Sequence, residues 1–180
     1  RTVYDSERHK RTNVSLQQAF ELSSNVGMAK MVMQHYSGNP EKFIGHLKRL
    51  RLHEVSGIDL VGETQPIIKT TKSKTWSATS LPWMSFGYEV LVSPLQTLML
   101  YNAVANNGKM MRPYLVQEVQ QDGRTIWNRE PEVMVESICK ETTLKQLKTS
   151  LEGVVLNGTA KSLSTPYYSI AGKTGTALVA

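Results

Sequence analysis

The sequence predicts a mixed α/β fold (α+β) that is mostly helical, with one β-hairpin and one terminal strand. Three observations lead to this prediction. Apolar residues recur at helical spacing in several segments, a glycine-containing turn separates two short β-prone segments, and residues 169–180 form a run of small and apolar residues. The chain has 180 residues, which is the length of about one ordinary domain.

The expected helices follow from apolar spacing and from residues that favour helix ends. Ser15 and Ser93 can each cap a helix, and Pro94 occupies a first helical position. Glycines at 38 and 108 mark helix ends. We expect helices over residues 15–22, 26–36, 40–51, 94–105 and 142–156. Because the segment 94–105 is almost wholly apolar, we expect a central buried helix there.

The expected strands are fewer. Residues 115–119 and 125–127 flank the turn pair Asp122-Gly123 and predict a hairpin. Residues 169–180 predict a strand at the end of the chain, and the sequence shows no strand that would pair with it. Residues 54–82 contain prolines, glycines and many polar residues without a helical stripe, so we expect a long loop region.

Composition excludes several classes of protein. Hydrophobic residues make up 40% and charged residues 20% of the chain, which excludes a disordered tail and a collagenous repeat. The single cysteine, Cys139, excludes an internal disulfide scaffold. No apolar run reaches the roughly 18 residues of a membrane span. The formal charge of +6 is dispersed, so we expect no nucleic-acid partner.

Metal and nucleotide sites are not expected. The four histidines, His9, His35, His46 and His53, show no i, i+4 pairing and no adjacent cysteine. Gly172-Lys173-Thr174 matches the end of a phosphate-binding loop, but Tyr167 stands where the first glycine belongs. We therefore expect no metal and no cofactor.

Two short segments together favour a peptide-binding site. Alone, the serines and asparagine of Ser23-Ser24-Asn25 are typical helix caps, and Lys173-Thr174-Gly175-Thr176 is an ordinary tetrapeptide. On a strand, the hydroxyls of Thr174 and Thr176 would share one face, and Gly175 would let a ligand backbone lie along the edge. Lys173 adds positive charge for an anionic terminus, while serine and asparagine supply a proton relay and an amide.

Ser23-Ser24-Asn25 and Lys173-Thr174-Gly175 resemble the SxN and KTG motifs of penicillin-binding proteins and serine β-lactamases, in the same order. The segments between them resemble the class B penicillin-binding proteins, and the whole resemblance covers residues 12–180. It is closest to the septal cell-division type of transpeptidase. The segments that carry it are GIDLVGE (57–63), SFGYE (85–89), SPLQ (93–96), AVANNG (103–108) with Pro113, and VVLNGTA (154–160).

The resemblance implies the serine β-lactamase and D,D-transpeptidase fold, and peptidoglycan cross-linking through a serine acyl-enzyme. It implies that Ser23 belongs to the proton relay, that Asn25 holds a substrate carbonyl and that Lys173 adds positive potential. Thr174 and Thr176 would bind the substrate carboxylate, with Gly175 between them, and the Thr176 N–H would be an oxyanion donor. Stem peptides of peptidoglycan and β-lactam antibiotics are the implied ligands, and cell-division proteins the implied partners.

The sequence departs from the family at the nucleophile, which an SxxK motif upstream of SxN normally supplies. Residues 1–22 contain no such motif, and the match Ser137-Ile138-Cys139-Lys140 is of a kind expected about once by chance in a chain of this composition. It also follows SxN instead of preceding it. We therefore expect the nucleophile to be absent from this chain, and the isolated chain to be inactive.

The resemblance sets further expectations. Residues 1–180 would form part of a transpeptidase domain, without several sheet strands and the SxxK helix. The terminal strand would leave an exposed sheet edge that associates with another chain. The parent protein would be anchored in the inner membrane and face the periplasm, while the fragment would be soluble. Two alternatives stay open: a penicillin-sensing receptor domain, and a noncatalytic peptidoglycan-binding or scaffold homologue.

Overall fold

A computed structural model describes residues 4–5 and 13–175 of the chain. The chain divides into two compact units. Unit 1 is formed by Arg1–Phe43, Lys69–Glu89 and Lys145–Ala180, and unit 2 by Ile44–Ile68 and Val90–Leu144.

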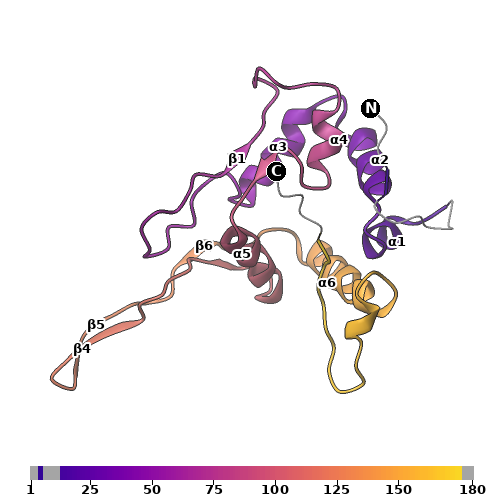
Figure 1. The fold of residues 1–180 in the computed structure, drawn as a ribbon. Coiled ribbons are helices and arrows are strands. Elements are labelled where there is room, and N and C mark those ends of the chain that lie inside the picture. Colours follow the sequence, from indigo (N-terminus) through magenta and orange to yellow (C-terminus); the bar gives the residue numbers. More distant parts are fainter. Residues whose placement is uncertain (1–3, 6–12, 176–180) are drawn as a thin grey trace. The chain divides into compact units, whose positions relative to one another are not determined.

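Helices dominate the described residues (Figure 1). They are α1 (Leu16–Glu21), α2 (Asn25–Tyr36), α3 (Pro40–Arg49), α4 (Ser80–Met84), α5 (Pro94–Ala105), α6 (Glu141–Leu156) and the 3-10 helix η1 (Lys161–Leu163). The strands are β1 (Ile67–Ile68), β2 (Val90–Leu91), β3 (Met110–Met111), β4 (Glu118–Gln121), β5 (Arg124–Asn128) and β6 (Val133–Val135). They pair as separate antiparallel ladders, β1 with β2, β3 with β6 and β4 with β5.

Unit 1 is held together by the contact of α2 with both α1 and α4. Ala29 and Val32 of α2 are buried, as are Leu81 and Met84 of α4. Gly27 allows α1 to approach closely, because a Cβ at this position would lie 2.7 Å from the Cβ of Ala19. A second cluster contains the buried residues Val154, Val155 and Ala160, with Phe20 and Ile170 packed against it.

Unit 2 packs around the inner face of α5. Met99 and Ala103 of α5 form a buried cluster with Met110 of β3. The α5 N-terminus has the expected cap: Ser93 and Gln96 form a reciprocal capping box. Gln96 is buried, and its amide also donates to the carbonyl of Glu54, 2.7 Å away. The SPLQ segment thus ties the helix start to the preceding loop.

The β4–β5 hairpin confirms the predicted turn at Asp122-Gly123, where both residues have positive φ, 51° and 72°. Figure 1 shows it extending away from α5. At its base, the carboxylate of Asp59 accepts hydrogen bonds from the backbone N–H groups of Leu115 (2.7 Å) and Val116 (3.1 Å). The hairpin is therefore clamped by the aspartate of the GIDLVGE segment.

Three sequence predictions need correction. The helix over 94–105 forms but is not wholly buried, because Leu98 is 62% exposed. The loop region 54–82 contains β1 and the start of α4, neither of which has a helical or alternating pattern long enough to be detected. Residues 169–175 form no strand, since none of them pairs in a ladder with another described segment.

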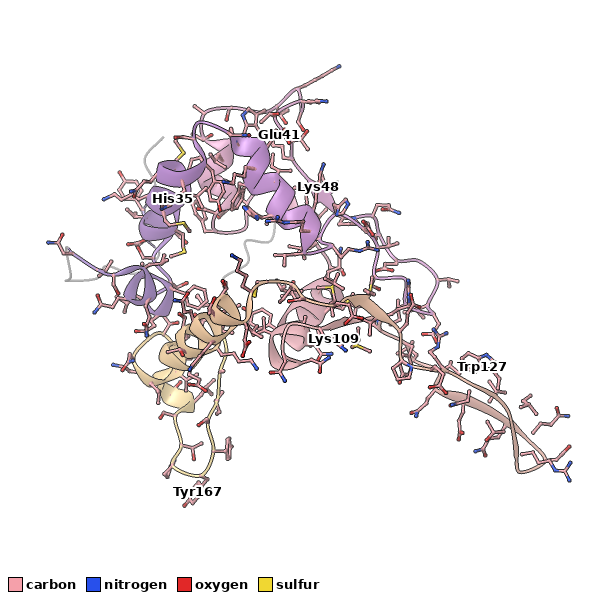
Figure 2. All side chains as sticks on the ribbon, turned by 180° about the vertical axis from the view of Figure 1, so that it is seen from behind. His35, Glu41, Lys48, Lys109, Trp127 and Tyr167 are labelled. Carbon is pink, nitrogen blue, oxygen red and sulfur yellow. The ribbon has the colours of Figure 1, made fainter. Side chains whose placement is uncertain are left out.

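The missing ladder also removes the predicted sheet edge from residues 169–175. The described part of this segment is anchored instead by one backbone hydrogen bond, from Gly172 N–H to the Leu151 carbonyl at 3.2 Å. Residues 176–180 of the predicted strand lie outside the described residues, and association with another chain stays a prediction. Figure 2 shows other apolar side chains in open positions, such as Trp127 on the hairpin and Tyr167 in the loop after η1.

Candidate active site

Both sequence motifs line one cavity of about 410 Å³ in unit 1. Ser23, Ser24 and Asn25 contribute from the junction of α1 and α2, and Lys173, Thr174 and Gly175 from the C-terminal segment. The remaining lining residues are Ala19, Phe20, Met28, Ser85, Phe86 and Tyr88. The segment SFGYE, singled out for its resemblance, thus supplies one wall.

The position of Ser23 follows from how α1 ends. The N–H of Ser24 bonds to the carbonyl of Ala19 (2.9 Å), and the N–H of Ser23 bonds to the carbonyl of Phe20 (3.1 Å). These are the paired bonds of a Schellman motif. Its first residue beyond the cap adopts a left-handed conformation, and Ser23 has φ of 56° there, where glycine is the usual residue. The turn therefore directs a serine side chain into the site at a cost in backbone strain.

The next two residues begin α2. Ser24 is its N-cap, and its hydroxyl accepts a hydrogen bond from the Gly27 N–H at 3.0 Å. The same hydroxyl donates to the carboxylate of Asp5, which also accepts from the Val26 N–H at 2.9 Å. Asn25 is the first helical residue and contacts the Tyr4 carbonyl through its amide at 3.4 Å. Helix capping thus fixes the place of Asn25 beside Ser23.

Lys173 joins the two motifs directly. Its Nζ donates to the hydroxyl oxygen of Ser23 at 2.6 Å, across 150 residues of sequence, and to the carbonyl of Thr174 at 2.9 Å. Because the Ser23 oxygen accepts from the ammonium, its own proton is available to another group. This arrangement suits a hydroxyl that passes a proton to a departing or attacking nitrogen.

Lys173 lies against apolar surface on one side. Its Nζ is 6.0 Å from the centroid of the Phe20 ring, within the range of a cation–π contact. Partial burial lowers the pKa of the Lys173 ammonium below its ordinary value, because desolvation disfavours the charged form. Phe20 belongs to the last turn of α1, three residues before Ser23. The end of this helix therefore positions both the ring and the hydroxyl that contact the Lys173 ammonium.

Of the three C-terminal residues predicted to bind substrate, Thr174, Gly175 and Thr176, the structure describes the first two. Thr174 is exposed at the cavity, and its hydroxyl oxygen lies 2.6 Å from that of Thr159. Gly175 also lines the cavity. Thr176, predicted to bind carboxylate and to stabilise an oxyanion, lies outside the described residues, so its roles stay predictions.

Sequence reasoning did not identify three residues that contact the motif residues: Asp5, which contacts Ser24, Phe20, which contacts Lys173, and Thr159, which contacts Thr174. Thr159 lies in the VVLNGTA segment, which was recognised by its resemblance but had no assigned contact. Phe20 follows the apolar stripe of its helix, and its contact with Lys173 depends on the fold. Asp5 is separated from Ser24 by 19 residues, so no local pattern marks it as a capping group.

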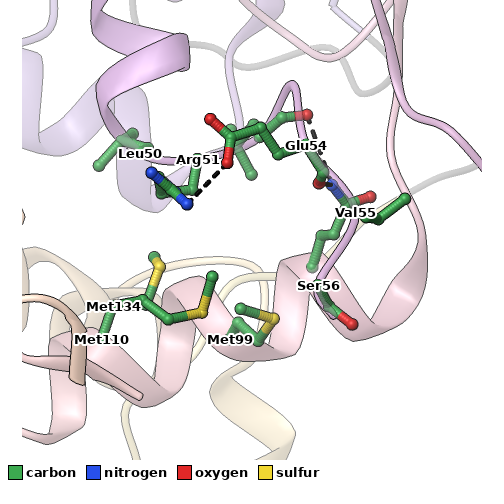
Figure 3. A pocket seen from close by; sticks show the side chains of 10 residues that line it. Leu50, Arg51, Glu54, Val55, Ser56, Met99, Met110 and Met134 are labelled. Atoms are coloured by element: carbon green, nitrogen blue, oxygen red, sulfur yellow. Dashed lines mark hydrogen bonds and ion pairs between the residues drawn. The ribbon is translucent and has the colours of Figure 1, made fainter. Parts of the chain in front are cut away.

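Other features do not compete as sites. A cavity in unit 2 has a volume of about 10 Å³, which is too small for a peptide. It is bordered by Met99, Met110 and Met134 and by the ion pair of Arg51 and Glu54, which are 2.7 Å apart (Figure 3). A hollow of about 560 Å³ beside Val14 and Met31 contains neither Ser23 nor Lys173. Among residues 4–5 and 13–175, no group of three or more histidine, cysteine or acidic residues could hold a metal ion.

Comparison with known proteins shows the family of the chain. The family model described as penicillin binding protein transpeptidase domain matches residues 2–180. The chain belongs to this transpeptidase family. The resemblance to class B penicillin-binding proteins is thereby confirmed.

Individual relatives in this family are similar to the chain at moderate sequence identity. Penicillin-binding protein PbpB of Mycobacterium tuberculosis is 29% identical over 185 residues, covering 98% of this chain and 26% of that protein. Peptidoglycan D,D-transpeptidase FtsI of Escherichia coli is 27% identical over 167 residues, covering 92% of this chain and 26% of that protein. The chain thus spans about a quarter of the length of these curated relatives.

A solved structure shows the same fold. Penicillin binding protein 3 of M. tuberculosis, in complex with ampicillin, matches with a TM-score of 0.82 and 26% identity, over 97% of this chain and 39% of that one. The predicted transpeptidase fold is therefore confirmed, with helices and few strands in the part of the fold that these 180 residues represent.

Two further sequence observations concern the SxxK match at Ser137 and membrane-spanning segments. The hydroxyl of Ser137, the chance SxxK match, donates to the Cys139 carbonyl at 2.7 Å, and Ser137 does not line the cavity. In the part of the chain that the structure describes, no helix is both long and apolar enough to cross a membrane.

Proposed function

We propose that this chain supplies the substrate-binding part of a peptidoglycan D,D-transpeptidase. The observation that carries the proposal is the 2.6 Å hydrogen bond from Lys173 to Ser23, which joins the two family motifs at one cavity. The substrate would be a stem peptide that ends in D-Ala-D-Ala, and β-lactam antibiotics would inhibit by imitating that terminus.

In the proposed reaction, a serine outside these 180 residues attacks the carbonyl of the penultimate D-alanine. A new ester bond forms, the peptide bond breaks, and the terminal D-alanine leaves with a proton. An amine from a neighbouring stem peptide then displaces the serine and completes the cross-link. Ser23 would carry the proton to the leaving nitrogen, since its hydroxyl proton is not used by Lys173.

The other motif residues would bind the peptide. Asn25 would hold a substrate amide carbonyl, Lys173 would add positive potential, and Thr174 and Thr176 would hold the terminal carboxylate. Gly175 would leave room for the substrate backbone, and the Thr176 N–H would donate to the oxyanion. Removal of one such donor typically lowers the rate about 10²- to 10³-fold.

We further propose that residues 1–180 form a partial transpeptidase domain that is inactive alone, because it lacks the nucleophile. The septal resemblance supports a role in cell division, with division proteins as partners. For the parent protein we propose a membrane anchor and a periplasmic active site. Each of these statements rests on the family resemblance.

The test is intact mass after incubation with benzylpenicillin. This chain is compared with a protein extended upstream by about 80 residues, enough for a complete nucleophile helix. We expect a single penicilloyl adduct on the extended protein only. Acylation of the short chain would show that it holds its own nucleophile, and Ser137→Ala would then identify or exclude Ser137. Absence of an adduct on both would favour a noncatalytic homologue.

A further inference from the structure

The hydroxyl groups of Thr159 and Thr174 form a short hydrogen bond, with their oxygens 2.6 Å apart. The two residues belong to different segments of unit 1. Thr159 follows the end of α6, and Thr174 lies in the C-terminal segment that lines the cavity. One of the two hydroxyls is the donor, and the direction of donation decides what Thr174 can offer to a ligand.

Thr159 is the better anchored partner. Its backbone N–H donates to the carbonyl of Glu21 at 3.2 Å, and Glu21 is a buried residue at the end of α1. Gly158 sits so close to the same carbonyl that a Cβ there would overlap it. The turn is closed by a bond from Ala160 N–H to the Val154 carbonyl at 3.1 Å. The Thr159 side chain therefore starts from a backbone fixed to α1, which also carries Phe20.

Thr174 is the exposed partner and the one that reaches the cavity. A hydroxyl has one proton. If Thr159 donates to Thr174, the Thr174 proton is free to point to a ligand in the cavity. In the reverse direction that proton is used, and Thr174 presents only lone pairs. Lys173 beside it favours an anionic ligand, which needs donors.

We propose that Thr159 is a positioning residue that donates its hydroxyl proton to the Thr174 oxygen and so fixes Thr174 as a donor to a ligand carboxylate. Thr159 does not itself line the cavity, so it acts through Thr174. This inference rests on the proposed function and deepens it, because it makes the recognition of the anionic terminus depend on a residue of the VVLNGTA segment.

The experiment uses the extended protein and compares acylation rates with benzylpenicillin, which carries a carboxylate, and with its methyl ester. Thr159→Val removes the hydroxyl and keeps the shape, whereas Thr159→Ser keeps the hydroxyl. Thr149→Val, on α6, is the matched control, since it removes a hydroxyl that bonds to the Lys145 carbonyl. A neutral hydrogen bond is worth enough to change a rate by about tenfold.

We expect Thr159→Val to lower the rate with benzylpenicillin about tenfold and to leave the rate with the ester within about twofold, as the carboxylate hydrogen bond is absent there. Thr159→Ser should retain the wild-type preference. In a Thr174→Val background, the Thr159→Val change should cost nothing further, because the two residues act in series.

Two results would overturn the inference. An equal loss of rate with acid and ester in Thr159→Val would mean that the residue only supports the fold. Wild-type rates with both compounds in Thr159→Val would mean that Thr159 has no influence on the recognition of the carboxylate. A wild-type extended protein that neither compound acylates would instead overturn the proposed function, and with it the basis of this inference.

Discussion

The carboxylate of Asp5 accepts a hydrogen bond from the hydroxyl of Ser24, the N-cap of α2, at 3.1 Å. It also accepts the N–H of Val26 at 2.9 Å. One acidic side chain therefore satisfies a cap hydroxyl and a free N–H in the first turn of the helix, close to its positive end. Since Asn25 lies between these two contacts, Asp5 supports a residue of the SxN motif without belonging to it.

Replacement of Asp5 should weaken this helix start. We expect Asp5→Ala to lower the free energy of unfolding by about 1 kcal/mol, as is typical for the loss of a helix cap. Asp5→Asn should lower it less, because one oxygen remains to accept both bonds. Chemical denaturation of the chain measures the difference, with Glu152→Ala, an exposed position of α6, as the control. Wild-type stability in Asp5→Ala would refute the capping role.

Ser23 combines the side chain of the proposed proton relay with a left-handed backbone, and two substitutions separate these properties. Both Ser23→Ala and Ser23→Gly remove the hydroxyl that Lys173 contacts. Only glycine relieves the positive φ of 56°, which costs other residues about 1 to 2 kcal/mol. We expect Ser23→Gly to be more stable than Ser23→Ala by about 1 kcal/mol in thermal or chemical unfolding.

The same pair tests the proton relay. In the extended protein, both variants should acylate with benzylpenicillin about 10²-fold or more slowly, as for loss of a general acid. Ser162→Ala, at an exposed serine of η1, should acylate normally. A Ser23→Gly variant that acylates at the wild-type rate would remove Ser23 from the relay, because this variant lacks the hydroxyl.

Burial of Lys173 predicts a pH dependence. Its pKa lies below the ordinary 10.5, because desolvation disfavours the ammonium. The ammonium therefore loses its proton at lower pH than an exposed lysine, and acylation by the anionic benzylpenicillin should decline on the alkaline side below pH 10.5. Lys173→Arg, which keeps its charge, should lack this decline. An identical alkaline decline in Lys173→Arg would exclude Lys173 as its cause.

The stability effect of Lys173 has the opposite sign. Between the lowered pKa and 10.5, the unfolded chain binds the proton that the folded chain has released. The free energy of unfolding should consequently rise with pH in this window, by an amount reduced by the remaining exposure of the side chain. Lys173→Arg should remove that rise, as seen in denaturation at several alkaline pH values.

Asp59 predicts a loss of stability in acid. The backbone N–H groups of Leu115 and Val116, and then Arg129, hold the pKa of its carboxyl below the usual 3.8. A lowered carboxyl pKa stabilises the fold above the unfolded value, and this contribution disappears as pH falls through the folded value. Asp59→Asn should be less stable than the wild type near neutral pH and should converge with it in acid.

Asp122→Asn is the matched control for Asp59, because it makes the same substitution in the turn of the hairpin, where asparagine is also well suited. It should follow the wild-type acid curve. Hydrogen exchange at the Leu115 and Val116 amides provides a local readout. If these amides are equally protected in Asp59→Asn and the wild type, Asp59 does not clamp the hairpin.

Local sequence signals predicted the elements whose hydrogen bonds join residues only a few positions apart. Ser15 and Ser93 begin helices through capping boxes with residues three positions on, and Asp122-Gly123 forms the expected turn. The strands β3 and β6 were not predicted, because two or three residues gain strand structure only from a partner more than twenty residues away. For the same reason, residues 169–175, the described part of the strand predicted over 169–180, form no strand, since no described segment pairs with them.

The sequence by itself determined the family, the order of its motifs and the residue types that bring chemistry to the site. Only the tertiary structure decided that Lys173 donates to Ser23, that Asp5 caps the SxN helix and that Thr159 meets Thr174. Motifs persist in a sequence as short patterns, whereas these contacts join residues 15 to 150 positions apart. Within unit 1, these residues are brought together by the packing of α1, α2 and residues 145–156 of α6, which no local sequence pattern encodes.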